Sequence, residues 1–110
     1  MKWFFILGLV VSVLAFGTLD VQAVDEYIVT IKDHKFIPEV VEIPVDTKVK
    51  LVIVNDDPTP EEFESHELNR EKIIRGHSKG SVFIGPLKAG EYPFFGEFNE
   101  ATAQGKVVVK

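Results

Sequence analysis

The chain contains no cysteine, and its single methionine is Met1. The absence of cysteine excludes disulfide bonds, thiol catalysis and every metal site that is built on thiolate ligands. Soft metal ions prefer sulfur, so a metal site in the remainder of the chain has to use oxygen and nitrogen ligands. We therefore expect a domain that is stabilised by core packing and strand pairing alone.

The sequence also lacks an apolar run of full membrane-spanning length. The longest run, Trp3 to Phe16, covers roughly fourteen residues, short of the ~20 that cross a bilayer. Lys2 precedes the run, and the small-residue pattern Val21-Gln22-Ala23 follows it. This arrangement predicts a signal peptide from Met1 to Ala23, with a retained membrane anchor as the alternative. We expect one exported domain, residues 24–110, in the periplasm, with no stable membrane insertion after cleavage.

Positive charge is scarce, since 12 Lys and Arg residues stand against 17 Asp and Glu residues, for a net charge of −5. No basic or aromatic-interleaved patch is present, which argues against nucleic acid and anionic membrane surfaces as partners and favours cations. The sequence also lacks a nucleophile elbow, a serine triad and a glycine-rich phosphate cradle. It therefore carries no hydrolase or transferase signature, although carboxylate pairs of the glycosidase type cannot be told from ordinary acidic loops.

Short alternating apolar segments, separated by turn residues, run through residues 24–110. They predict an all-β fold, a Greek-key β-sandwich. The segment Asp57 to Arg70 is expected to be the one long, charged connection, and Leu87, Gly90 and Tyr92 fit the L-x-x-G-x-Y pattern of a tyrosine corner. The expected strands are Glu26–Lys32, Val40–Pro44, Val49–Val54, Glu71–Ile74, Ser81–Ile84, Glu91–Phe98 and Lys106–Lys110.

Alternating strand direction predicts which loops meet at one end of the sandwich. The corner Asp33–Ile37, the loop Asn55–Glu61 and the loop Glu97–Gln104 share that end, and the turn Gly76–Gly80 joins them if the long connection crosses between sheets. Most of the chemically unusual side chains belong to this end: His34, Glu61, Glu62, Glu64, His77, Glu97, Asn99 and Glu100.

The segment Glu61 to Ser65, EEFES, is the strongest metal-site candidate at this end. If Phe63 points into the core, Glu62 and Glu64 share the opposite face of an extended chain, roughly 7 Å apart. Their carboxylates, together with an imidazole, suit Fe, Mn, Zn or Cu(II). The full candidate ligand set is His34, Glu61, Glu62, Glu64 and Glu97.

Each candidate also has a purely structural interpretation. The acidic residues of the EEFES segment fit a solvated surface as well as a metal site. His34 alternatively packs at the surface beside Phe36. Glu97 alternatively forms an ion pair with Arg70 or Lys72, since a buried carboxylate requires a partner. The two other histidines occur in polar contexts and are expected to be exposed.

The C-terminal segment resembles the closing motif of cupredoxins, Y-x-F-x-C-x-x-H followed by Met-x-Gly-x-Val-x-Val. The frame of the motif is kept by Tyr92, Phe94, Gly105, Val107 and Val109. Its metal ligands are not kept, because Gly96 stands at the cysteine, Asn99 at the histidine and Ala103 at the methionine. Glu61 stands at the remaining histidine of the family. The resemblance implies a cupredoxin-like sandwich without a type 1 blue-copper site.

Longer stretches resemble the EfeO-type cupredoxin-like proteins that are associated with bacterial ferrous-iron permeases. The matching residues are Asp33-His34, Thr59 to Ser65, Leu68, Arg70 to Lys72, Pro86-Leu87 and Phe95 to Phe98. Asn99 departs from this subfamily, which commonly has histidine there. The resemblance implies a periplasmic metal-handling protein that binds iron or Cu(II) and delivers iron to a permease or oxidises it as a ferroxidase component. The alternative is a metal-free β-sandwich that docks to a membrane or periplasmic transport partner.

Overall fold

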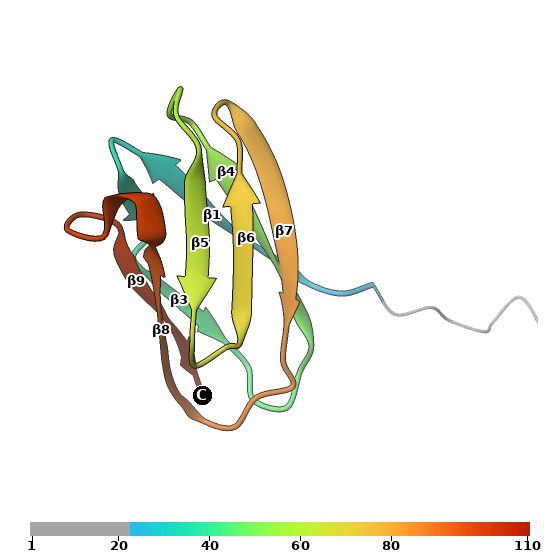
Figure 1. The fold of residues 1–110 in the computed structure, drawn as a ribbon. Coiled ribbons are helices and arrows are strands. Elements are labelled where there is room, and N and C mark those ends of the chain that lie inside the picture. The colour runs from blue at the N-terminus through green and yellow to red at the C-terminus, as the bar shows by residue number, and fades with distance from the viewer. Residues whose placement is uncertain (1–22) are drawn as a thin grey trace, which may run out of the picture.

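Two β-sheets pack face to face in the computed structural model, which describes residues 23–110 (Figure 1). The strand order is β2-β1-β4-β7 in one sheet and β3-β9-β8-β5-β6 in the other. The predicted all-β sandwich is therefore confirmed. The signal peptide prediction falls on residues outside the described range, except for Ala23. Within residues 23–110, no helix is long and apolar enough to cross a membrane.

The first sheet holds β1 (Glu26–Lys32), β2 (Lys35–Ile37), β4 (Val49–Asn55) and β7 (Ser78–Ile84). The second holds β3 (Val40–Ile43), β5 (Glu61–Ser65), β6 (Arg70–Ile74), β8 (Gly90–Gly96) and β9 (Gln104–Val109). A short 3-10 helix, η1 (Glu97–Asn99), follows β8 and replaces the last residues of the strand that the sequence predicts there.

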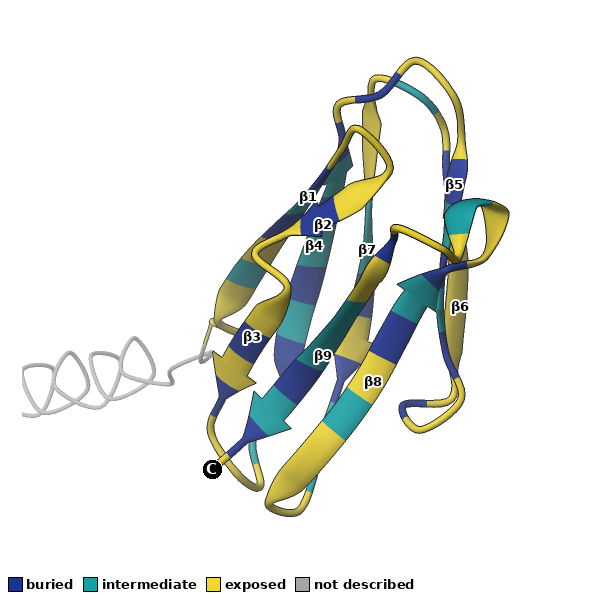
Figure 2. Ribbon diagram, turned by 90° about the vertical axis from the view of Figure 1, so that its left-hand side faces the viewer, coloured by how far each residue is buried: buried dark blue, intermediate teal, exposed yellow. Residues whose placement is uncertain are grey.

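The core lies between the sheets and follows the alternation of each strand. Along β4, Val49, Leu51 and Ile53 are buried and the residues between them are partly exposed, as the alternating bands of Figure 2 show. Three aromatic rings from different strands fill the core: Phe36 and Phe63 each lie 5.0 Å from Phe94, centroid to centroid. Their burial anchors β2 and β5 to β8 and positions the residues that follow.

The prediction of one long connection from Asp57 to Arg70 is wrong, because β5 forms within it and pairs with both β6 and β8. Phe63 is buried as expected, and Glu62 and Glu64 face outward. The two outward carboxylates made a half-buried strand look like a charged loop. Two further differences are local: β2 was not predicted, and β7 begins at Ser78, before the predicted strand.

Four loops meet at one end of the sandwich (upper part of Figure 1). Strand direction predicted three of them, and the turn Gly76–Gly80 joins them because β5 and β6 form a hairpin in place of the expected long connection. The Asp57 carboxylate accepts hydrogen bonds from the backbone amides of Asp33 (2.8 Å) and His34 (2.9 Å), and its own carbonyl accepts one from His77 (2.9 Å). Burial alone would raise the pKa of Asp57, but the two amide hydrogen bonds, from His34 and then Asp33, lower it. The Thr102 hydroxyl donates to the His34 carbonyl (2.6 Å) and adds the fourth loop.

At the opposite end, the tyrosine corner is present. The Tyr92 hydroxyl donates to the carbonyl of Lys88 at 2.8 Å, which ties the start of β8 to the preceding loop. The pattern from Leu87 to Tyr92 therefore predicted a real contact.

Candidate metal centre

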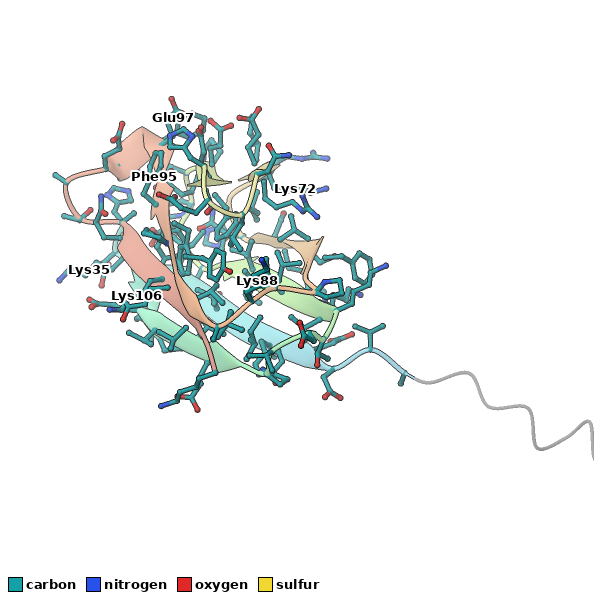
Figure 3. All side chains as sticks on the ribbon, turned by 90° about the horizontal axis from the view of Figure 1, so that it is seen from below. Lys35, Lys72, Lys88, Phe95, Glu97 and Lys106 are labelled. Atoms are coloured by element: carbon teal, nitrogen blue, oxygen red, sulfur yellow. The ribbon has the colours of Figure 1, made fainter. Side chains whose placement is uncertain are left out.

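Three carboxylates converge on the outer face of the second sheet. Glu62, Glu64 and Glu97 each offer an oxygen, and these oxygens lie within 4.8 Å of one another. Alternation along β5 turns Glu62 and Glu64 outward, and the pairing of Phe63 with Gly96 brings the end of β8 beside them. Glu97 follows directly at the start of η1. We call these three residues the outer carboxylate cluster; Figure 3 labels Glu97 and its neighbour Phe95.

The pKa values of two carboxyl groups in the outer carboxylate cluster are raised. A hydrogen bond with Glu97 is the main cause that raises the pKa of Glu64 to about 7, and burial and nearby carboxylates add to it. The same partner raises the pKa of Glu62. The pKa of Glu97 is lowered, because hydrogen bonds from Glu64 and then Glu62 favour its ionised form. Glu71 pairs with Glu64 in the strand register and adds a further negative charge to this face.

One oxygen of the cluster has no donor. Glu64 Oε1 is buried, and no hydrogen-bond donor from residues 23–110 reaches it. The other oxygen, Oε2, lies 3.9 Å from Nδ1 of His66. His66 is thus the imidazole beside the cluster. Sequence reasoning left it out, although residues 62, 64 and 66 share the same parity along the chain.

The remaining candidates lie elsewhere. His34 is outside the outer carboxylate cluster, and its ring Nε2 stands 3.5 Å from the Thr59 hydroxyl. Glu61 is only 1% exposed and faces the interior, where its carboxylate accepts hydrogen bonds from Glu62, Phe98 and Asn99. The structure therefore brings together three of the five predicted ligands and separates the other two from them.

The alternative that Glu97 forms an ion pair with Arg70 or Lys72 does not hold in the described part of the chain. No ion pair within 4.0 Å there involves Glu97. The Arg70 guanidinium donates instead to the carbonyls of Phe83 (2.8 Å) and Asn69 (2.9 Å), and Lys72 lies away from Glu97 in Figure 3. The negative charge of the cluster is therefore not neutralised by these side chains.

The chemistry of the cluster is that of a hard cation site. Three carboxylates supply only oxygen donors, which suit hard divalent ions such as Mn(II). The His66 imidazole beside them offers a nitrogen donor, and a mixed oxygen and nitrogen set suits Fe, Zn or Cu(II). Binding of a cation requires Glu64 to lose its proton, so metal uptake should release protons.

Comparison with known proteins agrees with this architecture. A family model described as a cupredoxin-like domain matches residues 4–109. The chain therefore belongs to the cupredoxin-like domain family. An uncharacterized protein of Rickettsia prowazekii (strain Madrid E) is 53% identical over 81 residues, which cover 74% of this chain and 65% of that protein. The chain thus matches less than two thirds of the length of this relative.

Solved structures with the same fold include copper proteins. The metal-binding domain of a Cu(I)-exporting P-type ATPase from Streptococcus pneumoniae superposes with a TM-score of 0.71 and 11% identity, over 83% of this chain and 91% of that one. Auracyanin A from Chloroflexus aurantiacus superposes with a TM-score of 0.70 and 13% identity, over 80% of this chain and 100% of that one. A reduced amicyanin variant superposes with a TM-score of 0.63 and 19% identity, over 81% of this chain and 86% of that one. At these identities the likeness shows the fold alone. Without cysteine, this chain has no blue-copper site.

Proposed function

We propose that this protein is a periplasmic, EfeO-type metal-handling protein that binds iron or Cu(II) at the outer carboxylate cluster and supplies iron to a permease. The observation that carries the proposal is the convergence of oxygens from Glu62, Glu64 and Glu97 within 4.8 Å. Like charges at this distance repel one another, and a divalent cation between them replaces repulsion by attraction. The segment match to proteins associated with iron permeases supports the choice of metal and partner.

The donor set also bears on the redox role. Carboxylate oxygens interact more strongly with Fe(III) than with Fe(II), because the Coulomb attraction grows with the charge of the ion. A site of this kind therefore favours the oxidised form of a bound iron. The proposal accordingly includes a ferroxidase role, in which each bound Fe(II) gives one electron to dioxygen as the external acceptor and leaves as Fe(III). The chain has no other enzymatic signature.

A second candidate function, docking to a transport partner without metal, is favoured by the apolar side chains that flank the cluster. Ile73 pairs with Glu62 in the strand register and is 57% exposed, and Phe98 follows Glu97 and is 49% exposed. An acidic face with exposed apolar residues fits a protein contact. The same face also suits a protein that hands its metal to a partner.

The double substitution Glu62→Gln and Glu64→Gln separates these functions. It keeps the shape of both side chains and removes two negative charges, so we expect Fe(II) and Cu(II) affinity to fall by roughly tenfold or more, about 1.4 kcal/mol. Calorimetric titration, with equilibrium dialysis and elemental analysis, measures the affinity.

The matched control is Glu42→Gln with Glu91→Gln. It removes the same number of carboxyl groups from two surface ion pairs, with Lys110 and Lys106, at a distance from the cluster. We expect it to bind metal as the parent protein does. If the cluster variant binds like the parent, or if both variants lose affinity equally, the cluster is not the site and docking becomes the leading function.

A further inference from the structure

The carboxylate of Glu61 lies on the inner side of β5, directly behind the outer carboxylate cluster. Its Oε1 accepts hydrogen bonds from the backbone amides of Glu62 (2.9 Å) and Phe98 (2.8 Å). Its Oε2 accepts one from the side-chain amide of Asn99 (2.7 Å). A buried carboxylate is costly unless donors replace water, and here three donors do so. This one group therefore joins the start of β5 to η1.

The space taken by this carboxylate explains why residue 96 is glycine. Gly96 has φ −97° and ψ 110°, a conformation open to any residue, so backbone strain is not the reason. A Cβ at this position would lie 2.6 Å from Cδ of Glu61 and 2.7 Å from Cβ of Ala103. Ala103 is itself fully buried, and its carbonyl accepts the Gly96 amide at 2.9 Å. The Glu61 carboxylate thus fills the volume that a longer side chain at position 96 would need.

Four positions meet at this point: Glu61, Gly96, Asn99 and Ala103. They are the positions at which the cupredoxin motif places its histidine, cysteine, histidine and methionine ligands. The residues present do not fit a copper ion. Glycine and alanine have no donor atom in the side chain, and the Asn99 amide and the Glu61 carboxylate are hydrogen-bonded to each other.

We propose that the Glu61 carboxylate takes the place of the metal ion in the interior of this fold. It links β5 to η1 through hydrogen bonds where a copper ion would link them through ligand bonds, and it closes the interior to metal. This inference is independent of the proposed function, because it concerns the inner face of β5 and holds whether or not the outer carboxylate cluster binds a cation.

Copper titration of two variants tests whether Glu61 closes the interior. Both carry Gly96→Cys, Asn99→His and Ala103→Met; one keeps Glu61 and the other adds Glu61→His. With Cu(II), we expect an intense thiolate charge-transfer band near ~600 nm only in the variant that has lost Glu61. A band of equal strength in the variant that keeps Glu61 would overturn the proposal, since the carboxylate would not be excluding the ion.

Thermal unfolding of single variants tests the link itself, and it decides the proposal if neither copper variant folds or develops colour. Glu61→Ala leaves three donors without an acceptor, so we expect the Tm to fall by about 10 °C or more. Glu62→Ala, at the adjacent outward position, is the matched control and should shift the Tm by no more than ~2 °C. Asn99→Ala removes one of the three hydrogen bonds and should lower the Tm by ~4–8 °C.

Two results contradict the proposal. One is a Glu61→Ala variant no less stable than Glu62→Ala, and the other is an Asn99→Ala variant as stable as the parent. If Glu61→Ala does not fold at all, the Asn99→Ala result alone decides between the two outcomes.

Discussion

The two faces of β5 place the same side chain in opposite environments. Glu61 points inward, is almost fully buried and receives three hydrogen bonds. Glu62 and Glu64 point outward, stand against a third carboxylate, and leave one buried oxygen without a donor. Adjacent glutamates therefore have different roles. Hydrogen-bond donors of the protein satisfy the inner carboxylate, whereas the outer carboxylates are free to bind a proton or a cation. Strand alternation, and not residue type, assigns these roles.

The comparison also separates stability from binding. Donors already occupy the oxygens of Glu61, so a metal would have to break three hydrogen bonds to reach them. In the outer carboxylate cluster a metal displaces only a shared proton and relieves repulsion. Changes at the inner face should therefore act on folding, and changes at the outer face on pH response and metal binding.

The largest change in stability is expected when a larger side chain is introduced at the inner face of β5. Gly96→Ala forces a methyl group against Glu61 and Ala103, and we expect the free energy of unfolding to fall by about 2 kcal/mol or more. Gly80→Ala is the control, because its added Cβ would lie 3.4 Å from flexible side-chain atoms of Ile74 and Lys72. Urea denaturation of both variants measures the difference. Equal losses of stability in the two variants would show that a methyl group at position 96 fits beside Glu61 and Ala103.

A smaller effect is expected from the protons of the outer face. The pKa of Glu64 is raised from its ordinary 4.5 to about 7 in the folded protein, and that of Glu62 is raised as well. Between these values the folded state binds more protons than the unfolded state, so stability falls as pH rises from 4.5 to 7. Glu97, whose pKa is lowered, acts in the opposite sense below 4.5.

Thermal unfolding across this pH window, in metal-free buffer, checks the trend. The Glu62→Gln and Glu64→Gln double variant removes both groups with raised pKa and should show a flatter profile between pH 4.5 and 7. A parent protein that gains stability over the same window, or a double variant with an unchanged profile, would show that the carboxylates do not share a proton.

The last prediction concerns the colour of the unmodified protein with Cu(II), where we expect no change. The unmodified protein, loaded with Cu(II), should show no intense band near ~600 nm, because copper-thiolate bonding is impossible without cysteine. Visible absorption spectroscopy makes the measurement. An intense blue colour in pure protein would mean that a type 1 site can form without the ligand that the chain lacks.

Much of the fold was predictable because alternation is a local signal. The strands around Val29 and Leu51 repeat apolar residues at every second position, the strand around Val107 is a run of valines, and the structure confirms all three. Strand direction then placed three loops at one end correctly, whereas the turn Gly76–Gly80 was assigned there only on condition of a long crossing connection. β5 escaped the prediction because its outward residues are both glutamates, so a strand with a buried Phe63 had the composition of a loop.

The site was predictable only in part. Phe63 was expected to point inward and to leave Glu62 and Glu64 on one outer face, and the structure confirms that orientation. Whether these residues hold a metal stays a prediction. Spacing did not reveal that His34 lies apart from the cluster, because loops that share one end of a sandwich need not turn their side chains to one point.

The amino-acid sequence by itself determined the fold class, the absence of a thiolate site and the acidic character of the segment Glu61 to Ser65, because each follows from composition or local periodicity. Only the tertiary structure decided which carboxylates meet. The register of β5 against β8 brings Glu97 to Glu62 and Glu64 and packs the Glu61 carboxylate against Gly96. Behind these residues Phe36, Phe63 and Phe94 from three separate strands pack against one another, a contact between distant segments that no local pattern encodes.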